Sequence, residues 1–240
     1  MSRYYTKVCN FYYGEHSKKL VKQNKAIPLH QIKEISFDHI EIITRKSKKK
    51  VSINKIRNLR KSLRDKIYFD LKKIKSRKKN FSNLDFKKIP NILGVLNLTP
   101  DSFSDGGKYN TKKKGVHHAV NLIKSGADLI DVGGESTRPG SKAISESLEW
   151  KRISKILKLL IKKKIPLSLD TRKSNIMEKG INHGVYLIND VSGLDFDVNT
   201  INILKKHKIP FVIQHTKGLP ENMQKKPSYK NVLLDIYDFF

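Results

Sequence analysis

Short apolar segments recur through the second half of the chain at intervals of 20 to 37 residues, and they constrain the fold more than any other feature. Each segment is apolar on both faces, which is typical of parallel strands covered by helices. Strands alternating with helices at this spacing predict an α/β fold of the (β/α)8 TIM-barrel type, in which about 250 residues supply eight units. Only the first five units are visible, and residues 229–240 predict the start of a fifth covering helix. The apolar segments lie at 91–96, 128–134, 165–171, 185–191 and 209–215, with helices expected near 112–125, 145–163, 173–183 and 199–207.

Polar side chains stand where each of these segments ends. The carboxyl ends of parallel strands share one face of a barrel, so we expect five separated positions to surround one mouth. Asp, Asn and Thr are also good amino-terminal caps of helices, which is the alternative for any single position. The positions are Asn97, Asp131 with Gly133 to Glu135, Asp170, Asn189 with Asp190, and His215.

These residue types suit a planar, nitrogen-rich ring bound beside an anion. A carboxylate accepts two N–H bonds from an amino-amidine edge, and an Asn side chain can donate and accept on the adjacent edge. The amide oxygen of Asn97 suits Mg²⁺, which takes substrate phosphate among its ligands. Arg138 offers a guanidinium fork for a carboxylate or a phosphate.

Two long stretches carry a family resemblance. "NLTPDSFSDGG" (97–107) and "GADLIDVGGESTRPGS" (126–141) resemble the paired signature of the dihydropteroate synthases. "LDTRK", "LINDVSGL" and "QHTKGLPENMQ" follow in that family's order, and the resemblance covers about residues 90–240. It implies a transferase of folate biosynthesis that condenses 6-hydroxymethyl-7,8-dihydropterin pyrophosphate with p-aminobenzoate, giving 7,8-dihydropteroate and pyrophosphate.

The resemblance also implies how the substrate that carries the pyrophosphate is held. Asn97 matches the ligand of Mg²⁺, the implied cofactor, which helps to hold the pyrophosphate. Asp170 and Asn189 match the two residues that bind and recognise the pterin ring.

Two polar loops are expected to close over the reacting centre. Thr137 and Arg138 match catalytic and substrate-binding positions of the second loop, close to the reacting centre. Phe103, Asp105 and Pro139 match positions that close over p-aminobenzoate. Asp105 is expected to stabilise the positive charge that develops on the pterin methylene after pyrophosphate leaves.

Residues 1–88 predict a small, basic α+β extension ahead of the barrel at 89–240. A strand at 35–44, a return strand at 48–54 and an amphipathic helix over 54–76 make up this extension. Residues 1–90 hold 26 Lys and Arg against 7 Asp and Glu, yet only 9 of the chain's 50 basic residues are Arg. Proteins that recognise nucleic acid rely on Arg side chains and on aromatic stacking with the bases. We therefore interpret the charge as a lysine bias and do not expect a nucleic-acid partner.

The sequence favours a cytoplasmic location. Cys9 is the sole cysteine, which fits a reducing compartment. The amino terminus has no apolar core of a secretory leader, and no apolar run reaches about 18 residues, so we expect no membrane partner. The family resemblance suggests a homodimer built on helices late in the barrel.

Two other functions stay open on the sequence alone. Methyltetrahydrofolate methyltransferases share the pterin-reading Asp and Asn positions, although they should not need the 97–107 loop. A non-catalytic barrel fragment with a basic binding arm is the other alternative. Five parallel strands cannot close a barrel, so we expect the sequence to be an incomplete piece of a normal enzyme.

Three residues of the predicted mouth carry structural alternatives. His215 is also explained as a histidine whose bonds are satisfied at a strand end, and Asp131 as a residue that holds a loop. Gln214 stands where the resembling family more often carries methionine, which loosens the apolar floor of the pterin region.

Overall fold

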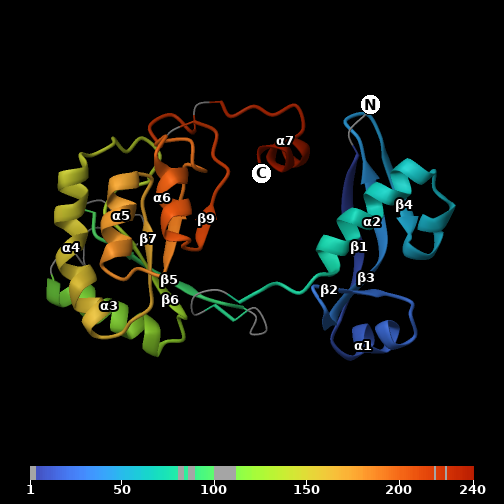
Figure 1. Cartoon of the computed structure of the whole chain (residues 1–240), viewed down its shortest axis with the longest axis horizontal. Coiled ribbons are helices and arrows are strands. Elements are labelled where there is room, and N and C mark those ends of the chain that lie inside the picture. The colour runs from blue at the N-terminus through green and yellow to red at the C-terminus, as the bar shows by residue number, and fades with distance from the viewer. Residues whose placement is uncertain (1–3, 81–83, 86–89, 100–111, 219, 225) are drawn as a thin grey trace. The chain divides into compact units, whose positions relative to one another are not determined.

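The computed structural model describes residues 4–80, 84–85, 90–99, 112–218, 220–224 and 226–240. It separates into two compact units, drawn in Figure 1. One comprises Met1–Lys79 with Lys230–Asp238, and the other Asn80–Tyr229 with Phe239–Phe240. The domain boundary expected at residue 88 stays a prediction. No helix among these described ranges has the length and apolar character needed to span a membrane.

The larger unit is built on a five-stranded, all-parallel sheet whose strands pair in chain order. This confirms the first five strands of the α/β barrel type expected from the sequence. The pairing of the described strands leaves the sheet open at β5 and β9. The strands are β5 (Leu93–Asn97), β6 (Leu129–Gly133), β7 (Leu167–Asp170), β8 (Leu187–Asp190) and β9 (Phe211–Ile213).

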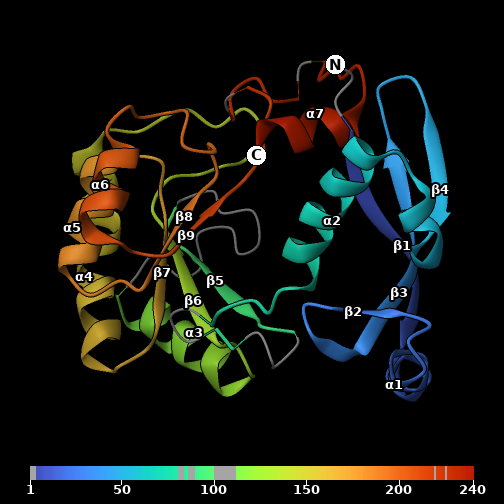
Figure 2. The ribbon, with the colours of Figure 1, turned by 45° about the vertical axis from the view of Figure 1, so that its right-hand side comes forward.

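Helices gather on one face of this sheet, as Figures 1 and 2 show. Their bounds follow the amphipathic segments of the sequence closely. Gly126 ends the helix at Lys112–Lys124 with φ +107°, a backbone conformation that glycine adopts without strain. Ser145 caps the second, because its hydroxyl accepts a hydrogen bond from the Leu148 amide. The helices are α3 (Lys112–Lys124), α4 (Glu146–Lys162), α5 (Ser174–Asn182) and α6 (Thr200–His207).

The strands divide their side chains between two faces. Ile130 and Val132 of β6 are fully buried in the core against the helices, together with Leu157 of α4. Successive side chains of a strand point to opposite faces, so Asp131 and Gly133 lie on the other side. The same alternation applies to the neighbouring strands, and it gives the sheet one apolar face and one face with polar groups at its carboxyl edge.

The amino-terminal unit is an antiparallel sheet with helices. The long strand β3 pairs with β1 on one side and with β2 and β4 on the other. Phe37 and Ile40 of β3 are fully buried with Ile67 of α2 in the core of this unit. The elements are β1 (Tyr5–Tyr13), α1 (Gly14–Lys22), β2 (Ile27–Leu29), β3 (Ile32–Ile43), β4 (Lys48–Ser52), the 3-10 helix η1 (Ile53–Asn58) and α2 (Lys61–Lys75).

This unit contains more than the strand pair and helix expected from the sequence. Strands β1 and β2 and helix α1 are additions, and the expected helix over 54–76 divides into η1 and α2. Asn10 interrupts β1 with φ +58°, and only Tyr5 of that strand is buried, so β1 has no apolar alternation to signal it. Pairing with β3, rather than local pattern, stabilises it.

The carboxyl-terminal helix α7 (Val232–Phe239) differs from the expectation that it would cover the parallel sheet. Its residues up to Asp238 belong to the amino-terminal unit. Leu234 is buried with Tyr5 and Ile43. Arg45 donates from Nη1 to Asp235 at 2.7 Å and from Nη2 to Asp238 at 2.8 Å. These apolar and ionic contacts explain the placement.

We predict that Gly180→Ala destabilises the larger unit even though alanine favours helices. A Cβ at Gly180 of α5 would lie 2.4 Å from Leu169 Cδ2, in a core that is already filled. Overpacking of this kind lowers the free energy of unfolding by about 1–3 kcal/mol, more than the roughly 1 kcal/mol gained in helix propensity. Urea denaturation measures the difference, with Lys205→Ala on the exposed side of α6 as the control. Equal or higher stability of the Gly180 variant would contradict this packing.

Candidate functional site

Four residues form a row across the carboxyl edge of the parallel sheet. Asn97 of β5 pairs with Gly133 of β6, Gly133 pairs with Asp170 of β7, and Asp170 pairs with Asn189 of β8. Residues paired in this way point to the same face of a sheet. The structure therefore brings together Asn97, Asp170 and Asn189, which the sequence analysis placed around one mouth.

Gly133 makes room for the side chains on either side of it. A Cβ at this position would lie 3.2 Å from Asn97 Oδ1 and 3.3 Å from Asp170 Oδ2. Both oxygens thus lean over the glycine from opposite sides. Any larger residue would push the amide and the carboxyl group apart.

Asp170 is a half-buried carboxyl group surrounded by other acids. Burial raises its pKa well above the usual range, and the charges of Asp131 and Glu149 raise it further. No hydrogen bond or ion pair reaches Asp170 from the described residues. A carboxyl group in this state favours a ligand that brings N–H donors or positive charge.

Asp131 lies one layer deeper and holds the amide of Asn189. Asn189 Nδ2 donates to Asp131 Oδ2 at 2.9 Å, and Asp131 is 7% exposed. Burial raises the pKa of Asp131, while the hydrogen bond from Asn189 opposes the rise. Asn189 Oδ1 is buried and has no hydrogen-bond partner in the described part of the chain. Asp131 therefore orients Asn189 with its carbonyl oxygen available to a ligand.

Asp190 serves a different purpose from its neighbour Asn189. It is fully buried, and its Oδ1 accepts from the Ser192 amide and hydroxyl at 2.8 and 2.6 Å. Its Oδ2 accepts from the Leu194 amide at 3.0 Å. Asp190 thus shapes the loop after β8, and the expectation that it faces the mouth is corrected, because adjacent residues of a strand point to opposite faces.

The loop after β6 carries Thr137, Arg138 and Pro139. Thr137 and Pro139 are exposed and Arg138 is half-buried. The Ser141 amide donates to the Arg138 carbonyl at 2.9 Å, and the Gly140 amide donates to the Pro220 carbonyl at 2.8 Å. The loop is therefore closed on itself and joined to the loop after β9. The other two predicted site residues, Phe103 and Asp105, lie outside the described residues.

A buried ionic cluster, which we call the Glu135 cluster, lies behind these loops and was not anticipated from the sequence. Lys173 Nζ donates to Glu135 Oε2 at 2.5 Å and to Glu149 Oε2 at 2.6 Å. Arg172 Nε donates to Glu135 Oε1 at 2.8 Å, and the Thr171 hydroxyl donates to Glu149 at 2.6 Å. The two cations and two carboxylates are each less than 10% exposed, so the pairs are hardly screened by water.

The Glu135 cluster ties the ends of two strands together. Glu135 follows β6, and its Oε2 also accepts from the Ile144 amide at 2.9 Å. Burial raises the pKa of Glu135, but the Ile144 and Lys173 hydrogen bonds outweigh it and leave the pKa lowered. The sequence signal was present: charged residues directly follow two buried strands. Their mutual pairing could not be read from it.

The described side chains around the mouth do not provide enough ligands to hold a metal ion by themselves. No cluster of three or more His, Cys, Asp and Glu side chains able to hold a metal occurs among the described residues. Asn97 Oδ1 lies over Gly133 and is a neutral oxygen donor of the kind that Mg²⁺ accepts. The residues present fit an Mg²⁺ ion that takes its remaining ligands from substrate phosphate and water.

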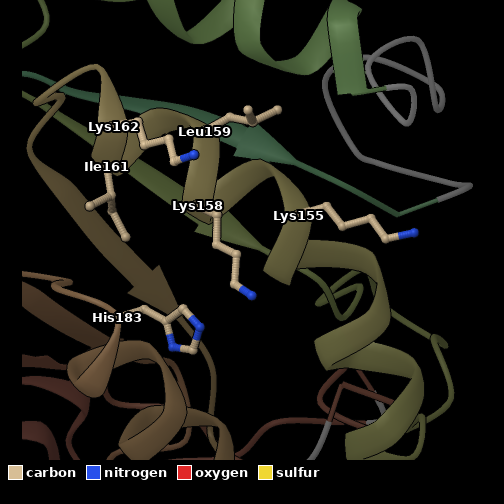
Figure 3. Close-up of a pocket in the computed structure, with 6 residues that line it drawn as sticks. All are labelled: Lys155, Lys158, Leu159, Ile161, Lys162 and His183. Carbon is tan, nitrogen blue, oxygen red and sulfur yellow. The ribbon is translucent and has the colours of Figure 1, made fainter.

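A separate hollow of about 450 Å³ lies on the outer side of α4. Figure 3 shows Lys155, Lys158 and Lys162 projecting from this helix, with His183 across from them. His183 precedes β8, so the hollow lies toward the amino ends of the strands, opposite the predicted mouth. It contains none of the predicted site residues.

Comparisons with known proteins agree with the fold and the motifs. A sequence model described as "Pterin binding enzyme" matches residues 93–240. Dihydropteroate synthase of Synechocystis sp. is 35% identical over 157 residues, covering 65% of this chain and 54% of the relative. That of Neisseria meningitidis serogroup C is 42% identical over 150 residues, covering 61% and 53%. The chain spans about half the length of the curated relatives it matches.

Solved structures give the same likeness. Yersinia pestis dihydropteroate synthase in a sulfonamide drug complex is 39% identical with a TM-score of 0.61, covering 65% of this chain and 56% of that one. Xanthomonas albilineans dihydropteroate synthase with 4-aminobenzoic acid is 35% identical with a TM-score of 0.54, covering 62% and 52%.

We predict that Asp170→Asn stabilises the ligand-free protein at neutral and alkaline pH. The pKa of Asp170 is raised by folding, so the folded state binds more protons than the unfolded state, and stability falls as the pH rises through that window. The amide of asparagine does not ionise, so the variant does not lose stability as the pH rises. Thermal unfolding between pH 4 and pH 8 measures it: the variant's advantage should shrink toward acid pH. A variant less stable than wild type at pH 8 would contradict a raised pKa.

We also predict that Lys173→Met severely destabilises the larger unit. Removing this cation leaves Glu135 and Glu149 buried without it, and breaking a buried ion pair lowers the free energy of unfolding by about 3–5 kcal/mol. Lys206→Met is the matched control, since Lys206 pairs with Glu178 at 2.7 Å on an exposed surface and should change little. Denaturant unfolding compares the two, and equal effects would count against the Glu135 cluster.

Proposed function

The chain belongs to the pterin binding enzyme family, and on that premise we propose that it serves dihydropteroate synthesis in folate biosynthesis. The reaction is the transferase step in which 6-hydroxymethyl-7,8-dihydropterin pyrophosphate and p-aminobenzoate give 7,8-dihydropteroate and pyrophosphate. A cytoplasmic location and a homodimer, both expected from the sequence, belong to the same proposal.

The observation that carries the proposal is the row of Asn97, Gly133, Asp170 and Asn189. Asp170 is a half-buried carboxyl group with a raised pKa and no cation paired to it among the described residues. The amino-amidine edge of a pterin offers two parallel N–H groups that match the two oxygens of such a carboxyl group. Binding of the ring replaces the water that Asp170 loses on folding.

Asn189 extends recognition to the next edge of the ring. Its amide nitrogen is committed to Asp131 at 2.9 Å, so its carbonyl oxygen accepts an N–H from the pterin. Because Asp131 fixes this orientation before the ligand arrives, little side-chain entropy is lost on binding.

The pyrophosphate end of the substrate lies toward Asn97 and the loop after β6 in this proposal. Asn97 Oδ1 is the side-chain ligand for Mg²⁺, and Thr137 and Arg138 bind the phosphate oxygens. When bound, Mg²⁺ supplies positive charge that stabilises the departing pyrophosphate. No protein nucleophile is required, because the amine of p-aminobenzoate attacks the pterin methylene.

The loops complete the site. Pro139 borders the p-aminobenzoate position together with Phe103, and Asp105 stabilises positive charge on the pterin methylene. These assignments come from the family resemblance. The exposed setting of Pro139 leaves it accessible to a substrate.

We predict that Asp170→Asn weakens binding of 6-hydroxymethylpterin by about 10- to 100-fold. The variant loses charge-assisted hydrogen bonds to the ring, each contributing about 1.5–3 kcal/mol. Fluorescence titration of the full chain with this uncharged pterin measures the affinity. Asp195→Asn, an exposed carboxylate in the loop after β8, is the control. Unchanged affinity in Asp170→Asn would remove Asp170 from the pterin site and with it the main support for the proposal.

A further inference from the structure

We propose that a second hollow, beside the row of strand ends, is an oxyanion site organised by Arg172. The hollow has a volume of about 270 Å³ and is formed by the loops that follow four consecutive strands, β6 to β9. Thr137, Arg172, Ser192, His215 and Thr216 are among its lining residues. Neither the strand-end row nor the motifs quoted above assign a role to Arg172.

Arg172 is held rigidly, yet one of its donors is unused. The residue is 5% exposed, its Nε donates to Glu135 at 2.8 Å, and its guanidinium stacks 4.0 Å from the ring centroid of Phe196. Its Nη1 is buried and finds no hydrogen-bond partner in the described part of the chain. A buried charged donor without a partner is unfavourable, and a ligand oxygen relieves it.

His215 adds a second buried, unpartnered nitrogen beside the same hollow. Its Nε2 lies 3.0 Å from the Tyr229 hydroxyl, and its ring packs against Phe239 at 4.8 Å. Its Nδ1 is buried without a partner among the described residues. When Tyr229 donates to Nε2, the proton of the neutral ring is on Nδ1, which then donates.

The charge around the hollow favours an anion. None of the described residues lining it is Asp or Glu. The two acids that are bonded to its lining residues are already engaged: Glu135 accepts from Arg172 and Lys173, and Asp190 accepts from Ser192 and Leu194. Thr137 contributes a hydroxyl at the rim. Fixed N–H donors in a hollow without acids are the arrangement that binds a carboxylate or phosphate group.

The ligand class is therefore a small oxyanion, and its source is either a carboxylate or a phosphate. The choice between a carboxylate and a phosphate rests on the proposed function, because its substrates carry both groups. The binding of an oxyanion by Arg172 is independent of that function. Because Thr137 also borders the loop after β6, an anion in this hollow would lie next to the predicted reacting centre.

The test is a calorimetric titration of the full chain with inorganic pyrophosphate and, separately, with p-aminobenzoate, both in the presence of EDTA. Chelation removes any contribution from a metal at Asn97. We expect at least one of the two anions to bind, and Arg172→Lys to weaken that binding about tenfold or more, because lysine keeps a charge near Glu135 but lacks the fork. Binding of pyrophosphate alone assigns the site to phosphate, and binding of p-aminobenzoate alone assigns it to a carboxylate.

Arg152→Lys is the matched control. Arg152 donates to the Gly134 carbonyl at 2.8 Å and does not line the hollow, so its replacement should leave anion affinity unchanged. Circular dichroism confirms that each variant is folded, and His215→Gln provides a second probe that leaves the Glu135 cluster intact. It should also lower the affinity.

Failure of this inference differs from failure of the proposed function. The oxyanion site is overturned if neither anion binds the wild type, or if folded Arg172→Lys and His215→Gln variants bind the anion as well as the wild type does. This holds even if 6-hydroxymethylpterin binds through Asp170. Anion binding that depends on Arg172, in a chain that does not bind the pterin, supports the oxyanion site and removes the pterin assignment.

Discussion

The register of the parallel sheet is the constraint on which the site depends. Each strand is only three to five residues long, so a shift of one residue would turn Asn97, Asp170 or Asn189 toward the helices. The apolar face prevents that shift: Ile130, Val132, Leu167 and Leu169 are fully buried. The hydrophobic core thus determines the geometry of the polar row without containing any of it.

The acids near the mouth of the larger unit fall into two groups, paired and unpaired. Glu135 and Glu149 are neutralised by Arg172 and Lys173, and the resulting cluster connects the loops after β6 and β7 to α4. Asp170 receives no such partner, although it lies close enough to these acids to be affected by their charges. The paired acids make the loops rigid, and the unpaired carboxyl group of Asp170 is left for a ligand. Carboxyl groups with perturbed pKa values and no partner are typical of functional sites.

Much of this arrangement could be predicted from the sequence, because strands and helices of an α/β sheet follow local patterns. The segment "DLIDVGG" contains β6, and helix bounds such as Ser145 and Gly126 follow from capping preferences. What could not be predicted depends on contacts between distant residues. Asp190 and Asn189 are adjacent and equally polar, and only strand direction shows that they face opposite sides. Strand β1 is stabilised by pairing with β3, and the ionic cluster joins positions up to 38 residues apart.

The amino-terminal unit is made from both ends of the described chain, since Arg45 bonds to Asp235 and Asp238 and Leu234 packs on Tyr5. Contacts separated by about 190 residues form late, because the loop between them must first be closed. During synthesis on the ribosome, the sheet of this unit emerges well before α7 but waits for it, while the strands and helices between them can form in order. A segment that is made before the parallel sheet would then acquire its full set of contacts after it.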